Sequence, residues 1–393
     1  MSHPKWPLVP LGELITKSEE RVMVEADQDY PNFGIYNRGR GLFEKPSISG
    51  ATSSATSLYR ARANQFVYSR LFAFEGAYGW VPNRFDGYFV SNEFPLFECD
   101  GAKLLPEFLG WYFRNPATWT DLANLTTGMG SRRQRLKPEE FLRHGIRLPS
   151  LATQARIVDD LSRMASKITE SQECRLIADR DLSLVPVAMT HRLDLTNAEK
   201  ASRGWELTTF GELMSLSLND EPVIPGKEYP NVGIYSYGKG LFEKTPISGM
   251  STSAAKLRRL EKDQFVYSQL FAWEGAFALV SERYSGSYVS SEYPTFRANL
   301  DRILPEYIIA YFSSDRVWRM VAEESKGLGS RRQRVHPSQL LNLRAMVPPM
   351  SVQRSVKATI KANERSEMDR ALVKSELDAM MPSILDRAFK GDL

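Results

Sequence analysis

Short apolar stretches separated by glycines occupy the first two-thirds of residues 1–150. Phe66–Tyr68 and Tyr88–Val90 combine aromatic and β-branched residues, a composition typical of strands. Aromatic residues at near-helical spacing then predict a helix from Pro106 to about Ala123. A short helix at residues 137–142 and a strand at residues 146–149 complete a mixed pattern of strands and helices.

Long amphipathic helices are predicted after this pattern. No glycine or proline occurs from Ala152 to about Ser183, and apolar residues step 4-3-4 along it, as in a coiled coil. The seam residues are Ile157, Leu161, Met164 and Ile168. A second seam, within a helix from about Val352 to Lys390, is formed by Leu377, Met381, Ile384 and Ala388. Pro186 and Pro382 are expected to interrupt the two helices near their ends. A helix of roughly 32 residues would be about 48 Å long.

The whole arrangement occurs twice. Residues 30–95 align with residues 229–294 at a constant offset of 199, and roughly 37 of the 66 aligned positions are identical. The predicted fold is α+β: two similar α/β domains separated by two long antiparallel helices that form a coiled coil, with pseudo-two-fold symmetry. The expected boundaries are residues 1–150, 151–195, 196–349 and 350–393. A duplicated domain suggests a substrate that is itself two-fold, and duplex DNA is the natural one.

The strongest local signal is a glycine- and arginine-rich loop that recurs in register. Glycines allow close approach to a phosphate, arginine can bind phosphate or guanine, and glutamine can pair with adenine. A solvated basic turn is the alternative, and repetition in register favours DNA binding. The candidate residues are Gly128, Gly130, Ser131, Arg132, Arg133, Gln134 and Arg135, with Gly327, Gly329, Ser330, Arg331, Arg332, Gln333 and Arg334 in the second copy.

Two further repeated segments are candidates for DNA contact. The first is a glycine-rich hairpin with basic tips, in which Arg38 and Arg40 correspond to Tyr237 and Lys239; an ordinary β-turn is the alternative. The second contains Arg70, which aligns with Gln269. If this position reads a base, arginine favours guanine and glutamine adenine, so the half-sites would differ there. Neutral surface drift remains the alternative. Leu71, Phe72 and Ala73 are expected in the core.

Bulk composition narrows the function classes. The net charge of +4 is only mildly basic, and two cysteines without metal-ligand spacing fit a reducing cytoplasm. The N-terminal residues lack an apolar signal core, and no apolar stretch is long enough to span a membrane. Asn115-Pro116 only partly matches the Asn-Pro-Pro-aromatic motif of adenine methyltransferases and is interpreted as a helix kink. No acid, base or metal-ligand set is repeated, so catalysis by this chain is not expected.

Over essentially its whole length the chain resembles the specificity (S) subunit of Type I restriction-modification systems. The resemblance is carried by the Gly-x-Gly-x-x-x-Gln-Arg loops at Gly128 and Gly327, by the strand endings before Gln154 and Gln353, and by the segment 383–393. It implies two target-recognition domains, each followed by a spacer helix, and no cofactor bound by this chain. The implied partners are double-stranded DNA, two methyltransferase subunits that use S-adenosylmethionine, and endonuclease subunits that use ATP and Mg²⁺.

The two recognition domains are unusually alike for this family, so the sequence predicts a bipartite, nearly palindromic target. Three rival hypotheses stay open. One is a DNA-recognition subunit of a fused Type II-like enzyme or another phage-defence complex. The others are a tandem ligand-binding scaffold protein, and an enzyme with one site in each repeat.

Overall fold

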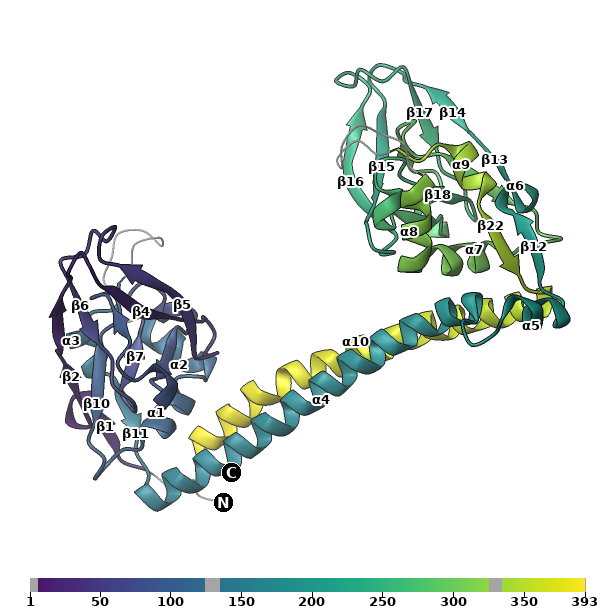
Figure 1. Ribbon diagram of the computed structural model, residues 1–393. Coiled ribbons are helices and arrows are strands. Elements are labelled where there is room, and N and C mark those ends of the chain that lie inside the picture. The colour runs from purple at the N-terminus through teal and green to yellow at the C-terminus, as the bar shows by residue number, and fades with distance from the viewer. Residues whose placement is uncertain (1–5, 124–134, 325–333, 393) are drawn as a thin grey trace. The chain divides into compact units, whose positions relative to one another are not determined.

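The computed structural model describes residues 6–123, 135–324 and 334–392 (Figure 1). The chain divides into two compact units, which are here called the first unit (Met1–Cys174 with Leu372–Leu393) and the second unit (Arg175–Ala371). The glycine- and arginine-rich residues 128–134 and 327–333 lie outside the described residues. No helix in the described ranges combines the length and apolar character that a membrane span requires.

The first unit is built on three small sheets. Apart from the parallel pair β4 and β9, neighbouring strands are antiparallel. The five-stranded sheet has the order β3 (Arg21–Met23), β6 (Ser57–Arg60), β9 (Phe89–Val90), β4 (Asp29–Ile35) and β5 (Leu42–Ser49). The four-stranded sheet has the order β2 (Ile15–Ser18), β10 (Leu96–Cys99), β7 (Phe66–Tyr68) and β8 (Tyr78–Trp80). The third sheet pairs β1 (Leu8–Pro10) with β11 (Gly145–Arg147).

The second unit repeats these sheets element by element. Its five-stranded sheet has the order β14 (Asp220–Pro222), β17 (Lys256–Arg259), β20 (Tyr288–Val289), β15 (Glu228–Ile234) and β16 (Leu241–Ser248). Its four-stranded sheet has the order β13 (Met214–Leu216), β21 (Thr295–Ala298), β18 (Phe265–Tyr267) and β19 (Phe277–Leu279). β12 (Glu206–Thr209) pairs with β22 (Arg344–Val347). The constant offset of 199 therefore reflects conserved strand positions as well as conserved residues.

Aromatic residues fill the cores. In the first unit Phe66, Tyr68 and Phe141 are fully buried, and the rings of Phe66 and Phe141 are parallel with centroids 5.8 Å apart. A second cluster joins the two larger sheets, because it contains Phe33 of β4 and Val67 of β7. Because such rings bury large apolar areas, these clusters supply most of the driving force for folding each unit.

The helix predicted from Pro106 to Ala123 is in fact two helices, so that prediction was wrong. α1 (Pro106–Tyr112) ends before α2 (Pro116–Ala123), and the second unit has the same break between α7 (Pro305–Phe312) and α8 (Asp315–Glu324). A tryptophan explains the break in both. The indole N–H of Trp119 donates to the carbonyl of Phe113 at 2.7 Å, and that of Trp318 donates to Phe312 at 2.6 Å. Each bond occupies a carbonyl that a continuous helix would use.

The smaller helices are α3 (Pro138–Leu142), α5 (Asn197–Ser202), α6 (Phe210–Leu213) and α9 (Pro337–Asn342). Among the described residues, 3-10 turns lie in both units: η1 (Leu11–Glu13), η2 (Ala73–Glu75) and η3 (Asn83–Phe85) in the first, and η4 (Ala272–Glu274) and η5 (Glu282–Tyr284) in the second. Of these, η2 and η4 matter most here, because they lie next to the segments predicted to bind DNA.

The long helix α4 (Leu151–His191) follows the first sheet-rich domain along the chain, and α10 (Met350–Lys390) follows the second, as the sequence predicted. They pair antiparallel within each unit. In the first unit the Gln172 amide donates to Asp378 at 3.1 Å, and in the second unit Arg370 forms an ion pair with Asp179 at 3.3 Å. Ile157 and Leu161 are buried, which confirms the start of the predicted seam.

Both prolines lie inside these helices, contrary to the predicted interruption. A proline at position 186 leaves the carbonyl of Leu182 without its helical donor. The side-chain amide of Asn363, on α10, donates to that carbonyl at 2.8 Å. The partner helix thus replaces the missing hydrogen bond, and α4 continues to His191 because the cost of the proline is offset.

A buried glutamine near the start of each long helix forms hydrogen bonds to the backbone of the preceding domain. Gln154 and Gln353 are 0% and 1% exposed. The side-chain oxygen of Gln154 accepts from the N–H of Leu105 at 2.9 Å, and its amide donates to the carbonyls of Lys103 and Pro149 at 2.8 and 2.9 Å. Gln353 makes the three equivalent bonds. All polar groups of each site are therefore satisfied, which holds the helix start at one orientation to its domain.

Candidate nucleic-acid interface

The hairpin containing Arg38 and Arg40 connects β4 to β5, and its tip rests on a neighbouring turn. The N–H of Arg38 donates to the carbonyl of Glu75 at 2.7 Å, and that of Gly39 to Gly76 at 2.8 Å. In the second unit Tyr237 and Gly238 make the same bonds at 2.7 and 3.0 Å. Arg38 and Tyr237 have φ values of 61° and 62°, a left-handed conformation that disfavours side chains. The two bonds hold this backbone, and the side chain is directed to solvent.

The repeated carboxylates Glu75 and Glu274 have a structural role. Glu75 accepts a hydrogen bond from the Asn37 amide, and Glu274 accepts from the Ser236 hydroxyl at 3.0 Å. Each carboxylate therefore joins the hairpin tip to the turn beneath it. Within residues 6–123, 135–324 and 334–392, no group of three or more His, Cys, Asp or Glu is placed to hold a metal ion.

Exposed tyrosines accompany the basic hairpin residues, and the sequence reasoning did not select them. The guanidinium of Arg40 lies 4.8 Å from the ring centroid of Tyr36, which also packs against Phe43. Its counterpart Tyr235 stacks on Phe242 with centroids 4.0 Å apart and is 50% exposed. Exposed aromatic rings beside cations suit contact with bases and sugars. The alternation of aromatic and basic residues in 36–40 and 235–239 is the signal that could have revealed them.

Arg70 and Gln269 lie beside the ends of the two glycine- and arginine-rich segments. The carbonyl of Arg70 accepts from the N–H of Leu136 at 3.0 Å, and the hydroxyl of Tyr68 donates to the carbonyl of Leu136 at 3.1 Å. Gln269 and Tyr267 hold Val335 in the same way, at 3.0 and 2.8 Å. Burial raises the pKa of Tyr68 and of Tyr267 well above the ordinary value, so both remain hydroxyl donors.

The expectation that Leu71 and Phe72 lie in the core was wrong. Leu71 is 37% exposed and Phe72 47% exposed, whereas Ala73 is buried. Phe271 is likewise 47% exposed. The 3-10 turns η2 and η4 begin directly after these phenylalanines, and each turn directs only its alanine inward. The sequence carries no periodicity that separates these neighbours, because the segment is shorter than one helical repeat.

Of the arginines in the repeated loops, Arg135 and Arg334 are described. Each forms an ion pair at 3.2 Å, Arg135 with Glu93 and Arg334 with Glu292. Both arginines are about half exposed, so each pair contributes at most about 1 kcal/mol. The remaining loop candidates, residues 128–134 and 327–333, lie outside the described residues.

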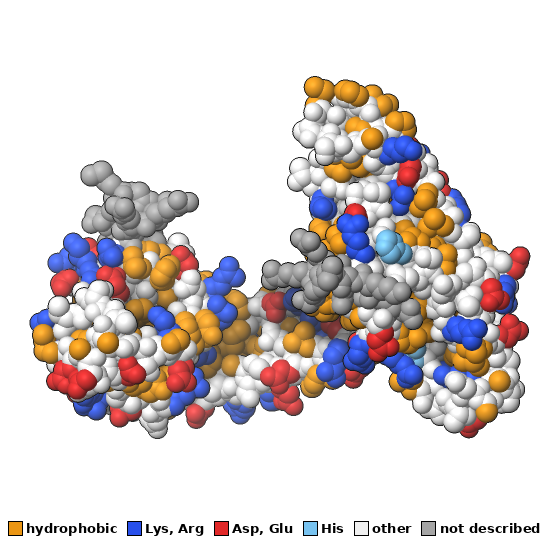
Figure 2. Space-filling view, turned by 45° about the horizontal axis from the view of Figure 1, so that its top comes forward, with side chains coloured by type: hydrophobic (Ala, Val, Ile, Leu, Met, Phe, Trp, Pro, Cys, Tyr) orange, Lys and Arg blue, Asp and Glu red, His pale blue; other side chains and the backbone are white. Residues whose placement is uncertain are grey.

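A single short segment connects these features in each unit. Residues 69–76 contact the hairpin tip at one end and the residue after the glycine- and arginine-rich segment at the other. The sequence candidates Arg38, Arg70 and Arg135 therefore come from three separate chain segments that share one support. Figure 2 shows lysine and arginine side chains interspersed with apolar ones on the visible face of each unit. Surfaces that combine cations with exposed aromatic rings, such as those of Tyr36 and Tyr235, suit nucleic acid.

Other charged positions differ between the units. The guanidinium of Arg114 lies 4.1 Å from the ring centroid of Trp111, and burial lowers its pKa. Together with Arg38 and Arg40 it lines a cavity of about 650 Å³. The residue that aligns with Arg114 in the second unit is Ser313, which carries no charge. At this position, therefore, only the first unit has a cation.

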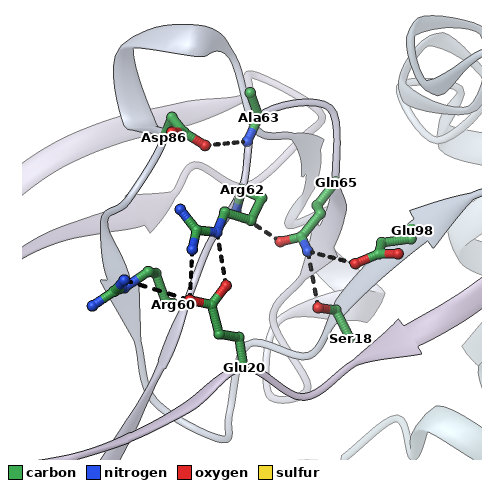
Figure 3. A network of polar contacts seen from close by, with 8 residues as sticks. All are labelled: Ser18, Glu20, Arg60, Arg62, Ala63, Gln65, Asp86 and Glu98. Carbon is green, nitrogen blue, oxygen red and sulfur yellow. Dashed lines mark hydrogen bonds and ion pairs between the residues drawn. The ribbon is translucent and has the colours of Figure 1, made fainter.

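A polar network around Glu20 also belongs to the first unit (Figure 3). Glu20 forms ion pairs with Arg62 at 2.6 Å and Arg60 at 3.5 Å, while the buried Gln65 contacts Ser18 and Glu98. In the second unit the residue aligned with Arg62 is Glu261, which pairs with Arg297 and accepts from Asn219 at 3.2 Å. The same backbone is therefore held by charges of opposite sign.

The fold defined by these elements, two sheet-rich domains alternating with two long paired helices, also occurs in solved structures. No protein-family model matches the sequence, and comparison with curated proteins finds no match. Among structures, the chain is similar to a chain from a study of complex assembly and conformational transition of the type I R-M system. The TM-score is 0.70 with 17% identity, covering 100% of both chains. It is also similar to the HsdS subunit from Thermoanaerobacter tengcongensis, with a TM-score of 0.59, 18% identity and coverage of 99% and 98%. The resemblance drawn from the sequence is thus confirmed at the level of the fold.

Proposed function

We propose that this chain is the DNA-specificity subunit of a Type I restriction-modification complex. The observation that carries the proposal is the full-length structural similarity to chains from such systems, at a TM-score of 0.70 over both complete chains. The exposed basic and aromatic residues repeated in the two units support it independently, because they occur at the same backbone positions. In this role the chain reads sequence and supplies no catalytic group.

The target is bipartite and nearly palindromic. Two recognition units with the same strands, the same hairpin tip and the same 69–76 and 268–275 supports would read similar half-sites in inverted orientation. Differences between the half-sites arise where the units differ at the hairpin tip, at Arg38 and Tyr237. The candidate residues 128–135 and 327–334 complete each reading surface.

The long helices set the spacing of the half-sites. Each has 41 residues, which corresponds to about 62 Å, compared with about 48 Å for the roughly 32 residues predicted for the first of them. At about 3.4 Å per base pair, this length limits the distance between half-site centres to about 18 base pairs.

The exposed faces of the long helices bind methyltransferase subunits. In the second unit Leu176 is 63% exposed and Met368 83% exposed, and in the first unit Leu372 is 60% exposed. Further exposed apolar residues on these helices are Ile177, Leu184, Val185, Val373 and Met380. So many exposed apolar side chains on one pair of helices are typical of a surface that a partner covers. S-adenosylmethionine is then bound by the methyltransferase partners, and ATP and Mg²⁺ by endonuclease partners.

Methylome sequencing tests this function. DNA modified by the chain together with its methyltransferase partner should carry methyladenine at one bipartite site whose halves are similar and inverted. Partner alone is the control and should leave no such site. Absence of any sequence-specific methylation with both components would overturn the proposed function. Unrelated half-sites would overturn only the near-palindromic target.

A further inference from the structure

A cavity of about 330 Å³ lies beside Arg70 in the first unit. Its polar lining comes from Lys17, Arg70, Asn92 and Lys137, with Glu139 as the carboxylate among them. The volume lies at the lower end of the range of small-ligand sites, roughly 300–1,000 Å³. The cavity adjoins the end of the glycine- and arginine-rich segment, because Leu136 donates to the carbonyl of Arg70 at 3.0 Å.

Two of the cations in this cavity have no protein partner among the described residues. The Nε of Arg70 is buried without a hydrogen-bond acceptor. The Lys17 ammonium pairs with Glu19 at 2.7 Å. The Lys137 ammonium, by contrast, forms no ion pair with the described residues. A buried, unpaired donor costs about 1–3 kcal/mol, and more when it is charged. An unsatisfied group of this kind, in a cavity that a second cation also lines, indicates a place for an anion.

In the second unit, the positions that align with these two cations hold neither lysine nor arginine. Arg70 and Lys137 align with Gln269 and His336, and the cavity residue Tyr59 aligns with Arg258. Arg258 is 4% exposed, donates to the Asp220 carboxylate at 2.8 Å and to the carbonyl of Tyr293 at 3.0 Å. Its charge is therefore satisfied inside the protein, and it occupies the position from which Tyr59 lines the cavity of the first unit.

We propose that the cavity is a phosphate-binding site, in which Arg70 and Lys137 bind one phosphodiester group of the bound duplex, and that only the first unit has it. This inference rests on the proposed function. It assigns Arg70 to the DNA backbone and not to a guanine base. A base edge is neutral and would leave Lys137 without a counter-charge, whereas a phosphate satisfies both cations at once. The two units then read similar half-sites with unequal numbers of phosphate contacts.

The test uses the full chain assembled with its methyltransferase subunits and a duplex containing the site found by methylome sequencing. Affinity is measured over a range of salt concentrations. Arg70→Gln with Lys137→His, which gives the first unit the residues of the second, should weaken binding about tenfold at low salt. The slope of log K against log salt should fall by about 0.9, the value for one phosphate. Lys103→Gln with Arg147→Gln removes the same charge near the start of α4 and should leave the slope unchanged.

A scan with single methylphosphonate linkages locates the phosphate. One neutral linkage in the half-site of the first unit should weaken binding of the unaltered complex as much as the double substitution does. The same linkage should cause no further loss of affinity in the double variant. Arg70→Lys with Lys137→Arg keeps both charges and should retain the slope, which controls for misfolding.

Three outcomes separate the hypotheses. An unchanged slope together with an unchanged methylphosphonate profile overturns the phosphate site. A shift in the methylated sequence at constant slope overturns it in favour of base reading by Arg70. Failure of the unaltered complex to bind any specific duplex overturns the proposed function itself.

Discussion

The polar networks at Glu20 in the first unit and at Glu261 in the second hold the same loop with opposite charges. The loop entering β7 is fixed in the first unit by Gln65, which accepts from the N–H of Arg62 at 2.8 Å, and in the second by Gln264, which accepts from Glu261 at 2.9 Å. Both glutamines are buried. Around Gln65 the partly exposed ion pairs join Glu20 to arginines (Figure 3), whereas around Gln264 the carboxylate is Glu261, which pairs with Arg297.

Between the two units, the buried contacts stay constant and the exposed ion pairs change. Buried hydrogen bonds and aromatic packing are costly to alter, so they recur in both units. Exposed ion pairs contribute little to stability, so their signs can diverge freely. The two units therefore share a scaffold and differ in the charge that they present to a partner.

The largest predicted effect tests whether the scaffold is equivalent in both units. Gln154→Leu leaves the N–H of Leu105 and two carbonyls without partners, and should lower the free energy of unfolding by about 3–5 kcal/mol. Gln353→Leu should cost the same amount. Calorimetry measures both, and Glu170→Leu, at an exposed position of α4, serves as the control with an effect below about 0.5 kcal/mol. A large inequality between the two variants would contradict the equivalence.

A smaller effect is expected at the turn beneath the hairpin tip. Gly76 has φ +79°, and a Cβ atom there would overlap the indole ring of Trp119. Gly76→Ala should cost about 2–4 kcal/mol through backbone strain and displacement of the ring. Gly87 has nearly the same φ with open space around it, so Gly87→Ala should cost only about 1 kcal/mol. Equal losses measured by chemical unfolding would show that the contact with Trp119 is unimportant.

The buried ion pair of the second unit should contribute less, because Asp220 is one-third exposed. Arg258→Tyr should destabilise that unit by about 1–3 kcal/mol, below the roughly 3–5 kcal/mol for a fully buried pair. Adding Asp220→Arg recreates the residues of the first unit at both positions and should recover most of the loss. Thermal unfolding of the single and double variants measures the recovery. A further loss of stability in the double variant would contradict the view that the two units hold this position in alternative ways.

The smallest effect is predicted at Arg38, whose left-handed backbone carries a side chain. Arg38→Gly should stabilise the first unit by about 1 kcal/mol while weakening binding to the target duplex. Tyr237→Gly is the matched variant in the second unit. A gain in stability without any loss of affinity would show that the strained residue is not part of the reading surface.

The sequence predicted the fold class and the repeat well, because both depend on periodic patterns that span many residues. It failed where a single tertiary contact decides the outcome. The spacing of apolar residues predicts one helix at residues 106–123, but the indole of Trp119 bonds to a carbonyl where α1 ends. Conversely, Asn363 bonds to a carbonyl of α4 and allows that helix to continue past Pro186. Both donors lie outside the local pattern that predicts the element.

At the candidate site, the basic hairpin and Arg70 could be selected from the repeat, because they lie in segments that are otherwise nearly identical in the two copies. The exposure of Phe72 and the burial of Arg258 could not be selected, because both depend on how neighbouring segments pack. The cavity beside Arg70 likewise emerges only when β2, β6 and the residues after the glycine- and arginine-rich segment are brought together.

The first unit is formed by two segments that lie far apart in the sequence, and this affects how it folds during synthesis. Leu385 and Ala388 of α10 are buried in the same core as Phe108 and Leu161, and Phe389 packs edge-on against Phe108 with centroids 5.4 Å apart. The ribosome therefore synthesises about 200 residues of the second unit before the chain that completes the first core emerges. Until then the first unit exposes an unfinished apolar surface during translation. A circular permutant that begins near position 372 would remove this delay, because its first unit would be contiguous in the order of synthesis.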